Sequence, residues 1–140
     1  MFYGAIALTI LSNLLYHLFQ KVIPGNVNPM VSLAVTYLVA ATATLLLLPL
    51  FPVQGTLGAE LRKVNWASVA LGGVIVGLEL GFLLAYRAGW NLNLANLVSN
   101  TTVAILLIPL GLLLFKEHLS PLNILGVILA IAGLVLVNLR

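Results

Sequence analysis

Glu79 lies near the centre of an apolar stretch that runs from residue 67 to residue 89. A carboxylate at such depth costs roughly a few kcal/mol on insertion scales, so it indicates a functional site. On a helix, its face also carries Tyr86 and Trp90. An acid in line with aromatic rings is typical of a site for an organic cation, which it binds through charge pairing and cation–π contacts.

A plainer interpretation of the two aromatic residues stays open. Tyrosine and tryptophan gather in belts at both surfaces of a bilayer. Trp90 adjoins a turn at Gly89 and Asn91, where such a belt is expected. Tyr86 and Trp90 therefore either line a binding site or anchor a helix at the membrane surface.

Polar side chains form narrow stripes in two further apolar stretches. The apolar stretch over residues 2–23 carries Asn13, Tyr16 and His17, and the apolar stretch over residues 92–115 carries Asn96 and Asn100. Amides inside a membrane are tolerated where they meet polar partners or water. These residues therefore either orient a substrate in a cavity or only join helices by hydrogen bonds. His17 either relays protons or packs as a hydrogen-bonded side chain.

Five membrane spans must position these residues, because each apolar run is near the ~20 residues that cross a bilayer. The predicted spans cover residues 2–23, 29–48, 66–88, 92–115 and 121–139. Pro29 and Pro121 each follow a polar capping residue at the start of a helix. The connections are too short for a soluble domain. We therefore predict an all-α membrane protein with one domain of five transmembrane helices over residues 1–140.

The composition excludes several classes of protein. Hydrophobic residues make up 62% of the 140 residues and charged residues 6%, whereas soluble domains carry about 25% charged residues. We therefore expect an integral protein of a prokaryotic inner membrane, surrounded by lipid. The basic residues are scattered singly, which argues against a nucleic-acid partner.

The residue types also argue against catalysis. The chain has no cysteine, so disulfides and thiolate metal sites are excluded. No pairing of a nucleophile with a base and no cluster of metal ligands is visible in the sequence. We expect no enzyme activity, no metal and no cofactor.

Small residues define two faces on which another helix can approach closely. One face lies opposite Glu79 in the third span, and the other lies in the fifth span. The predicted packing or dimer residues are Gly73, Gly77, Gly81, Gly126, Ala130 and Gly133. The alternative is that these are ordinary small residues of membrane helices.

Lysine and arginine are balanced between the two sides of the membrane. The two sets, N-terminal side first, are Arg62, Lys63 and Lys116 against Lys21, Arg87 and Arg140. Orientation follows the lysine and arginine bias of short loops. Without such a bias, copies are predicted to insert both ways and to pair as an antiparallel homodimer. A fixed orientation set by one strong helix is the alternative.

The join between the fourth and fifth spans resembles the drug/metabolite transporter superfamily in its EamA-like branch. From Ile108 to Gly126 the chain reads IPLGLLLFKEHLSPLNILG, followed by VILAIAGLVLV. Glu117 matches the acidic residue of that family's repeat, and Gly126 and Gly133 match the glycines of its last helix. The stretch from Tyr86 to Leu97 also resembles the family's segment before its fourth span.

The resemblance implies a fold and an activity. Family members usually carry two five-span repeats of opposite orientation, and this chain looks like one repeat, so it would dimerise antiparallel. The activity implied is export or exchange of small metabolites or drugs. The small multidrug resistance branch is similar in size, but its essential glutamate lies in the first span, where this chain has Asn13. Its coupling mechanism therefore does not transfer to Glu79.

Taken together, these patterns predict a secondary transporter of small organic molecules, cationic and proton-coupled, that works by alternating access. In this interpretation Glu79 binds a proton or a cationic substrate, and each displaces the other. The residues around it would line the site or orient the substrate: Tyr86, Trp90, Asn13, Tyr16, Asn96 and Asn100. Two alternatives stay open, a subunit of a lipid-carrier flippase and a structural bundle without transport.

Overall fold

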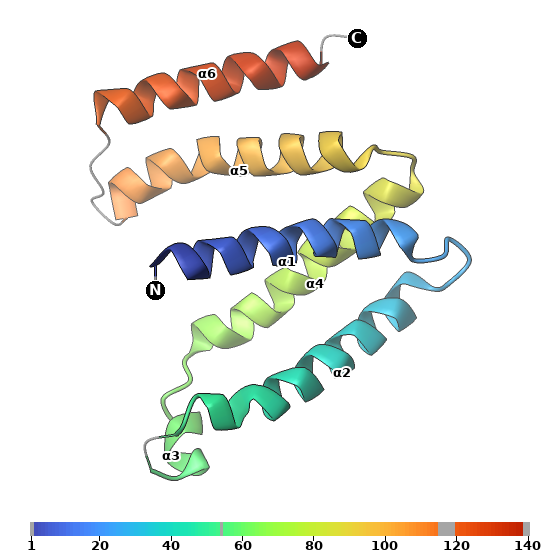
Figure 1. Ribbon diagram of the computed structural model, residues 1–140, viewed down its shortest axis with the longest axis vertical. Helices are drawn as coiled ribbons and strands as arrows, with labels where there is room; N and C mark the ends of the chain where they lie inside the picture. The colour runs from blue at the N-terminus through green and yellow to red at the C-terminus, as the bar shows by residue number, and fades with distance from the viewer. Residues whose placement is uncertain (1, 54, 115–119, 139–140) are drawn as a thin grey trace. The chain divides into compact units, whose positions relative to one another are not determined.

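The computed structural model describes residues 2–53, 55–114 and 120–138, and every regular element in these ranges is helical (Figure 1). The elements are α1 (Phe2–Val22), α2 (Pro29–Leu47), η1 (Leu48–Leu50), α3 (Leu57–Leu61), α4 (Trp66–Arg87), α5 (Leu92–Leu114) and α6 (Pro121–Asn138). Glu117, which carries part of the family resemblance, lies outside the described residues.

Polar side chains explain where several helices begin. Asn28 Oδ1 accepts a hydrogen bond from the Met30 backbone N–H at 2.9 Å, directly before the proline that opens α2. Asn65 Oδ1 caps α4 in the same way. Such caps satisfy backbone N–H groups that have no partner within the helix. At the other end of α4, Gly89 has a φ of 97°, a conformation that glycine adopts readily after a helix.

The connection between α2 and α4 contains more structure than the loop expected there. Residues 48–50 form a 3₁₀ turn, and α3 follows with Thr56 as its capping residue. Glu60, within this short helix, forms an ion pair at 2.6 Å with Lys63, which follows it. The hydroxyl of Thr56 accepts a hydrogen bond from the Ala59 backbone N–H, and this cap accounts for the extra turn.

Four helices in the described part of the chain are long and apolar enough to cross a membrane. The spans are Tyr3–Val22, Pro29–Leu50, Trp66–Arg87 and Leu92–Leu114. In α6, which runs from Pro121 to Asn138, the apolar stretch is described over Pro121–Gly133. The protein is thus an all-helical membrane protein with four such helices, and a fifth crossing by α6 stays a prediction.

The chain divides into two compact units. The central unit comprises residues 18–88, and the terminal unit comprises residues 1–17 together with residues 89–140. In the central unit α2 packs against α4, and in the terminal unit α5 packs against α6. Few side chains are buried, and most of the large apolar ones are exposed. This pattern suits a protein whose helices face lipid, because lipid takes the place of an apolar interior.

Helix α4 has two contrasting faces, as its periodicity predicts. On the face of Glu79, Leu83 is 0% exposed and Tyr86 is 5% exposed. On the opposite face, Gly77 and its neighbours Gly73 and Gly81 are exposed, and no described atom beyond the adjoining backbone of α4 lies within 4 Å of a Cβ placed on them. The glycine face is therefore open within the central unit. A helix partner for it stays a prediction.

Candidate functional site

The central unit places Glu79 of α4 opposite Tyr37 of α2. A guanidinium nitrogen of Arg87, at the end of α4, donates to the Val27 carbonyl oxygen at 2.8 Å, just before α2 begins at Pro29. These two helix ends are therefore adjacent. Tyr37 lies about two turns from Pro29, and Glu79 lies about two turns from Arg87, which is about 12 Å along each helix. The two side chains consequently lie at about the same depth.

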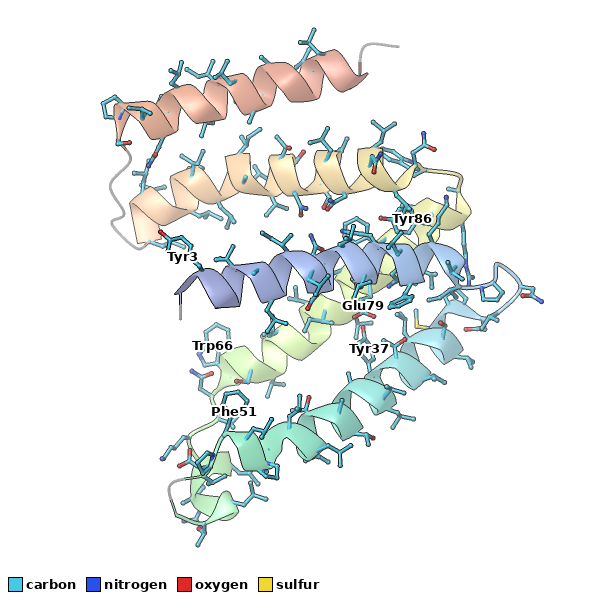
Figure 2. All side chains as sticks on the ribbon, in the orientation of Figure 1. Tyr3, Tyr37, Phe51, Trp66, Glu79 and Tyr86 are labelled. Atoms are coloured by element: carbon cyan, nitrogen blue, oxygen red, sulfur yellow. The ribbon has the colours of Figure 1, made fainter. Side chains whose placement is uncertain are left out.

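The polar ends of these two side chains face one another (Figure 2). The charge of Glu79 acts on the Tyr37 hydroxyl, so the two groups are electrostatic neighbours. Tyr37 Oη and Glu79 Oε2 are both buried, and neither has a hydrogen-bond partner among the described residues. A buried polar atom without a partner costs about 1–3 kcal/mol, and more when it is charged. Such a pair is suited to hold a proton or a ligand.

Tyr37 was not among the residues predicted from the sequence, although a signal for it exists. The other hydroxyls of α2 mostly bond to their own helix: Thr36, Thr42 and Thr44 each donate to the carbonyl oxygen four residues earlier. A threonine hydroxyl in a helix thus finds its hydrogen-bond acceptor within its own helix. A tyrosine hydroxyl stands too far from its own backbone to do so. A tyrosine in the middle of an apolar helix therefore needs a partner from elsewhere.

Tyr86 is held by groups of the chain itself. Lys21 Nζ lies 5.5 Å from the centroid of the Tyr86 ring and donates to the Tyr86 carbonyl oxygen at 3.4 Å. The Phe82 ring stacks on the Tyr86 ring with a centroid distance of 6.0 Å. Tyr86 thus already has a cation over its ring and an aromatic partner. This arrangement favours packing over substrate binding, and the predicted binding role stays untested.

Arg87 ties the turn between α1 and α2 to the end of α4. Its guanidinium donates to the carbonyl oxygens of Pro24 at 3.1 Å and Val27 at 2.8 Å. A cation at the carboxyl end of a helix also suits the negative end of the helix dipole. Both Arg87 and Lys21 therefore bond to carbonyl oxygens. Among the described residues no ion pair involves Glu79.

The terminal unit joins several predicted polar residues into one chain of hydrogen bonds. His17, which is 6% exposed, is hydrogen-bonded to the Asn96 side chain. The Asn96 side chain in turn accepts a hydrogen bond from Asn100 one turn along α5. The ring of Tyr16 meets the His17 ring edge to face, with centroids 5.1 Å apart. Asn13 is exposed on α1. Within this unit the amides of α5 connect to α1 through His17.

The predicted site residues thus divide between the two units. Glu79 and Tyr86 belong to the central unit. The terminal unit holds the remaining ones: Asn13, Tyr16, His17, Trp90, Asn96 and Asn100. Trp90 is 46% exposed. A single site that combines all of these residues with Glu79 stays a prediction.

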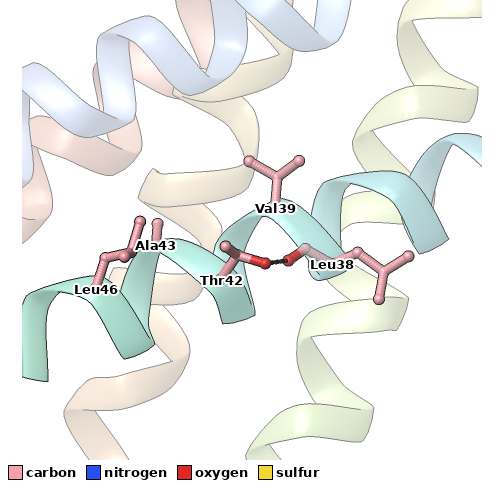
Figure 3. Close-up of a pocket in the computed structure, with 5 residues that line it drawn as sticks. All are labelled: Leu38, Val39, Thr42, Ala43 and Leu46. Atoms are coloured by element: carbon pink, nitrogen blue, oxygen red, sulfur yellow. Dashed lines mark hydrogen bonds between the residues drawn. The ribbon is translucent and has the colours of Figure 1, made fainter.

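An open pocket on one face of α2 has a different character. It is lined by Leu38, Val39, Thr42, Ala43 and Leu46 (Figure 3). The hydroxyl of Thr42, which is the polar side-chain group in this lining, already donates to the Leu38 carbonyl oxygen at 2.8 Å. The pocket therefore offers shape and apolar surface, and no side chain that could exchange a proton.

No group of three or more metal-ligating side chains occurs in the residues that the structure describes. Comparison with curated proteins and comparison with solved structures each gave no match. Residues 2–139 match the EamA-like transporter family, a family of membrane transporters and not of enzymes. This match spans nearly all of the 140 residues, and the apolar helices agree with it. The chain therefore belongs to the EamA-like transporter family.

Proposed function

We propose that the protein is a secondary transporter of small organic cations in which Glu79 binds a proton and the substrate in turn. The observation that carries this proposal is the Glu79 carboxylate itself. It lies within an apolar helix long enough to span a membrane, and its Oε2 atom is buried without a hydrogen-bond partner among the described residues. The family supports transport of a small substrate.

The proposed coupling follows from the cost of an isolated charge. A buried carboxylate without an opposite charge is strongly disfavoured, so it takes up a proton or a cation. One carboxylate does not hold both well, because a proton removes the charge that attracts the cation. Binding of the substrate on one side of the membrane therefore releases a proton. Binding of a proton on the other side releases the substrate.

We further propose that the working unit is an antiparallel homodimer. Lysine and arginine are balanced between the two predicted sides, and the glycine face of α4 is open within the central unit. A partner of opposite orientation would supply the inverted second half that alternating access requires. A cysteine introduced as Ala59→Cys would be unique, since the chain has none. Labelling from both sides of intact cells is expected, and labelling from one side alone would contradict dual insertion.

The coupling is tested by proton release in proteoliposomes that contain a pH-sensitive dye. A panel of organic cations is added outside, and wild type is compared with Glu79→Gln. The variant is expected to lose cation-driven proton movement, because a neutral amide neither binds a proton nor attracts a cation. Glu60→Gln is the matched control, since Glu60 lies in the short helix α3 and pairs with Lys63. Cation-driven proton movement that persists in Glu79→Gln would remove the coupling role.

A further inference from the structure

We propose that Glu79 and Tyr37 together select substrates whose ammonium group carries N–H donors, and that they discriminate against quaternary ammonium ions. This inference rests on the proposed function and names its substrate class more closely. The carrying observation is a pair of buried oxygen atoms, Glu79 Oε2 and Tyr37 Oη. They belong to packed helices, face one another at the same depth, and have no hydrogen-bond partner among the described residues.

Hydrogen-bond chemistry decides which cation fits this pair. A primary ammonium has three N–H donors, so it can donate to the carboxylate and to the phenol oxygen at the same time. Both buried atoms are then satisfied, and the bond to the carboxylate is a strong, charge-assisted one. A quaternary ammonium has no N–H group. It would neutralise the charge of Glu79 but leave the hydrogen-bonding capacity of Tyr37 unmet.

The usual way to bind a quaternary ammonium is a set of aromatic faces, which attract the cation without hydrogen bonds. In the described part of the central unit, the aromatic pair nearest Glu79 along α4 is Phe82 with Tyr86. The Tyr86 ring is buried and already has Lys21 over it. The Tyr86 ring, one aromatic face that could favour a quaternary ion, is therefore occupied by a lysine of the chain itself.

Among the described residues of the central unit, Lys21 and Arg87 do not take the place of the substrate. Lys21 donates to the Tyr86 carbonyl oxygen, and Arg87 donates to the carbonyl oxygens of Pro24 and Val27. All of these bonds lie at one end of the central unit, about two turns from Glu79. Glu79 is thus positioned to receive its positive charge from a ligand.

The test compares two cations that differ only at nitrogen. Phenethylammonium and its N,N,N-trimethyl derivative are titrated into detergent-solubilised protein and followed by calorimetry. Wild type is expected to bind the primary amine at least about tenfold more tightly, as expected for a charge-assisted hydrogen bond. Tyr37→Phe is expected to lower the affinity for the primary amine by about three- to tenfold and to leave the affinity for the trimethyl derivative unchanged. Tyr3→Phe is the matched control, because Tyr3 is 87% exposed.

The outcomes separate this inference from the proposed function. Equal or tighter binding of the trimethyl derivative by wild type overturns the inference without any variant, and so does failure of both amines to bind. An unchanged preference in Tyr37→Phe also overturns it. If Glu79→Gln abolishes binding of both amines while wild type shows no preference, the proposed function is supported and the inferred selectivity for N–H donors is wrong. If Glu79→Gln binds both amines as wild type does, the proposed function falls as well.

Discussion

The two units of this protein treat their buried polar groups differently. In the terminal unit, His17, Asn96 and Asn100 form a chain of hydrogen bonds among themselves. In the central unit, Glu79 Oε2 and Tyr37 Oη lack such partners among the described residues. Polar groups that satisfy one another hold helices together. Polar groups left without partners inside a membrane protein cost stability, so their presence points to a ligand.

The comparison separates two roles that look alike in the sequence. Both units carry polar residues in apolar helices. The difference lies in whether a partner is supplied by the chain. Substitutions of Glu79 and Tyr37 should therefore change binding more than stability, and substitutions of the hydrogen-bonded residues of the terminal unit should do the reverse.

The largest expected effect comes from Glu79→Gln. Loss of the charge should lower coupled transport by about 100-fold or more, which corresponds to the roughly 3–5 kcal/mol at stake when a buried charge loses its partner. The free energy of unfolding should stay the same or rise, because a buried charge without an ion-pair partner is removed. Unfolding by titration with a denaturing detergent measures the second quantity. A clear loss of stability would show that Glu79 is structural.

Asn96→Leu is the corresponding change in the terminal unit. It removes the shared partner of His17 and Asn100, so the free energy of unfolding should fall by about 1–3 kcal/mol. Cation binding in the central unit should change by less than about twofold, as expected for independent sites. Asn93→Leu is a matched control, since Asn93 is exposed on the same helix. If Asn96→Leu abolished binding with little loss of stability, the division of roles would be wrong.

Arg87→Gln tests whether the two helix ends of the central unit are held together. Loss of its hydrogen bonds to two carbonyl oxygens should destabilise the turn between α1 and α2 by roughly 1.5–3 kcal/mol. Hydrogen exchange of the backbone amides in residues 25–28 should then become faster. Arg62→Gln, which alters an exposed arginine, serves for comparison. Equal exchange rates in the two variants would argue against the role of Arg87.

The smallest effect is expected for the stability of Tyr37→Phe. A hydroxyl without a partner adds no hydrogen bond, so its removal should change the free energy of unfolding by less than about 1 kcal/mol, in either direction. Tyr3→Phe gives the baseline in the same detergent titration. A loss of about 2 kcal/mol or more would reveal a hydrogen bond that holds the fold, and Tyr37 would then resemble the polar residues of the terminal unit.

Much of the local structure could be predicted from the sequence. The apolar runs and their capping residues locate the helices, because Asn28 and Asn65 satisfy backbone groups that apolar side chains do not. Helical periodicity also separates the Glu79 face of α4 from the glycine face. Both are local properties, determined by a few neighbouring residues. The fifth membrane crossing, by α6, stays a prediction.

The partners of the polar residues could not be predicted in the same way. Periodicity places Tyr86 beside Glu79 on one face, but it does not show that Lys21 lies over the Tyr86 ring. Nor does it show that Tyr37 comes to the depth of Glu79. These contacts join residues far apart in the sequence, and they depend on which helix packs against which. A carboxylate in an apolar helix is recognised as a candidate site residue by its charge alone. A tyrosine is recognised only when the groups around its hydroxyl are known.

The division of the candidate site between α2 and α4 also has a consequence for synthesis. The chain is made from its N-terminus at about 5–20 residues per second, so α2 is complete seconds before Glu79 is added. During that interval the Tyr37 hydroxyl has no carboxylate opposite it. A nascent chain that ends before α4 has the capped start of α2 but not the acidic half of the pair. The site is thus assembled only when the later helix is inserted beside the earlier one.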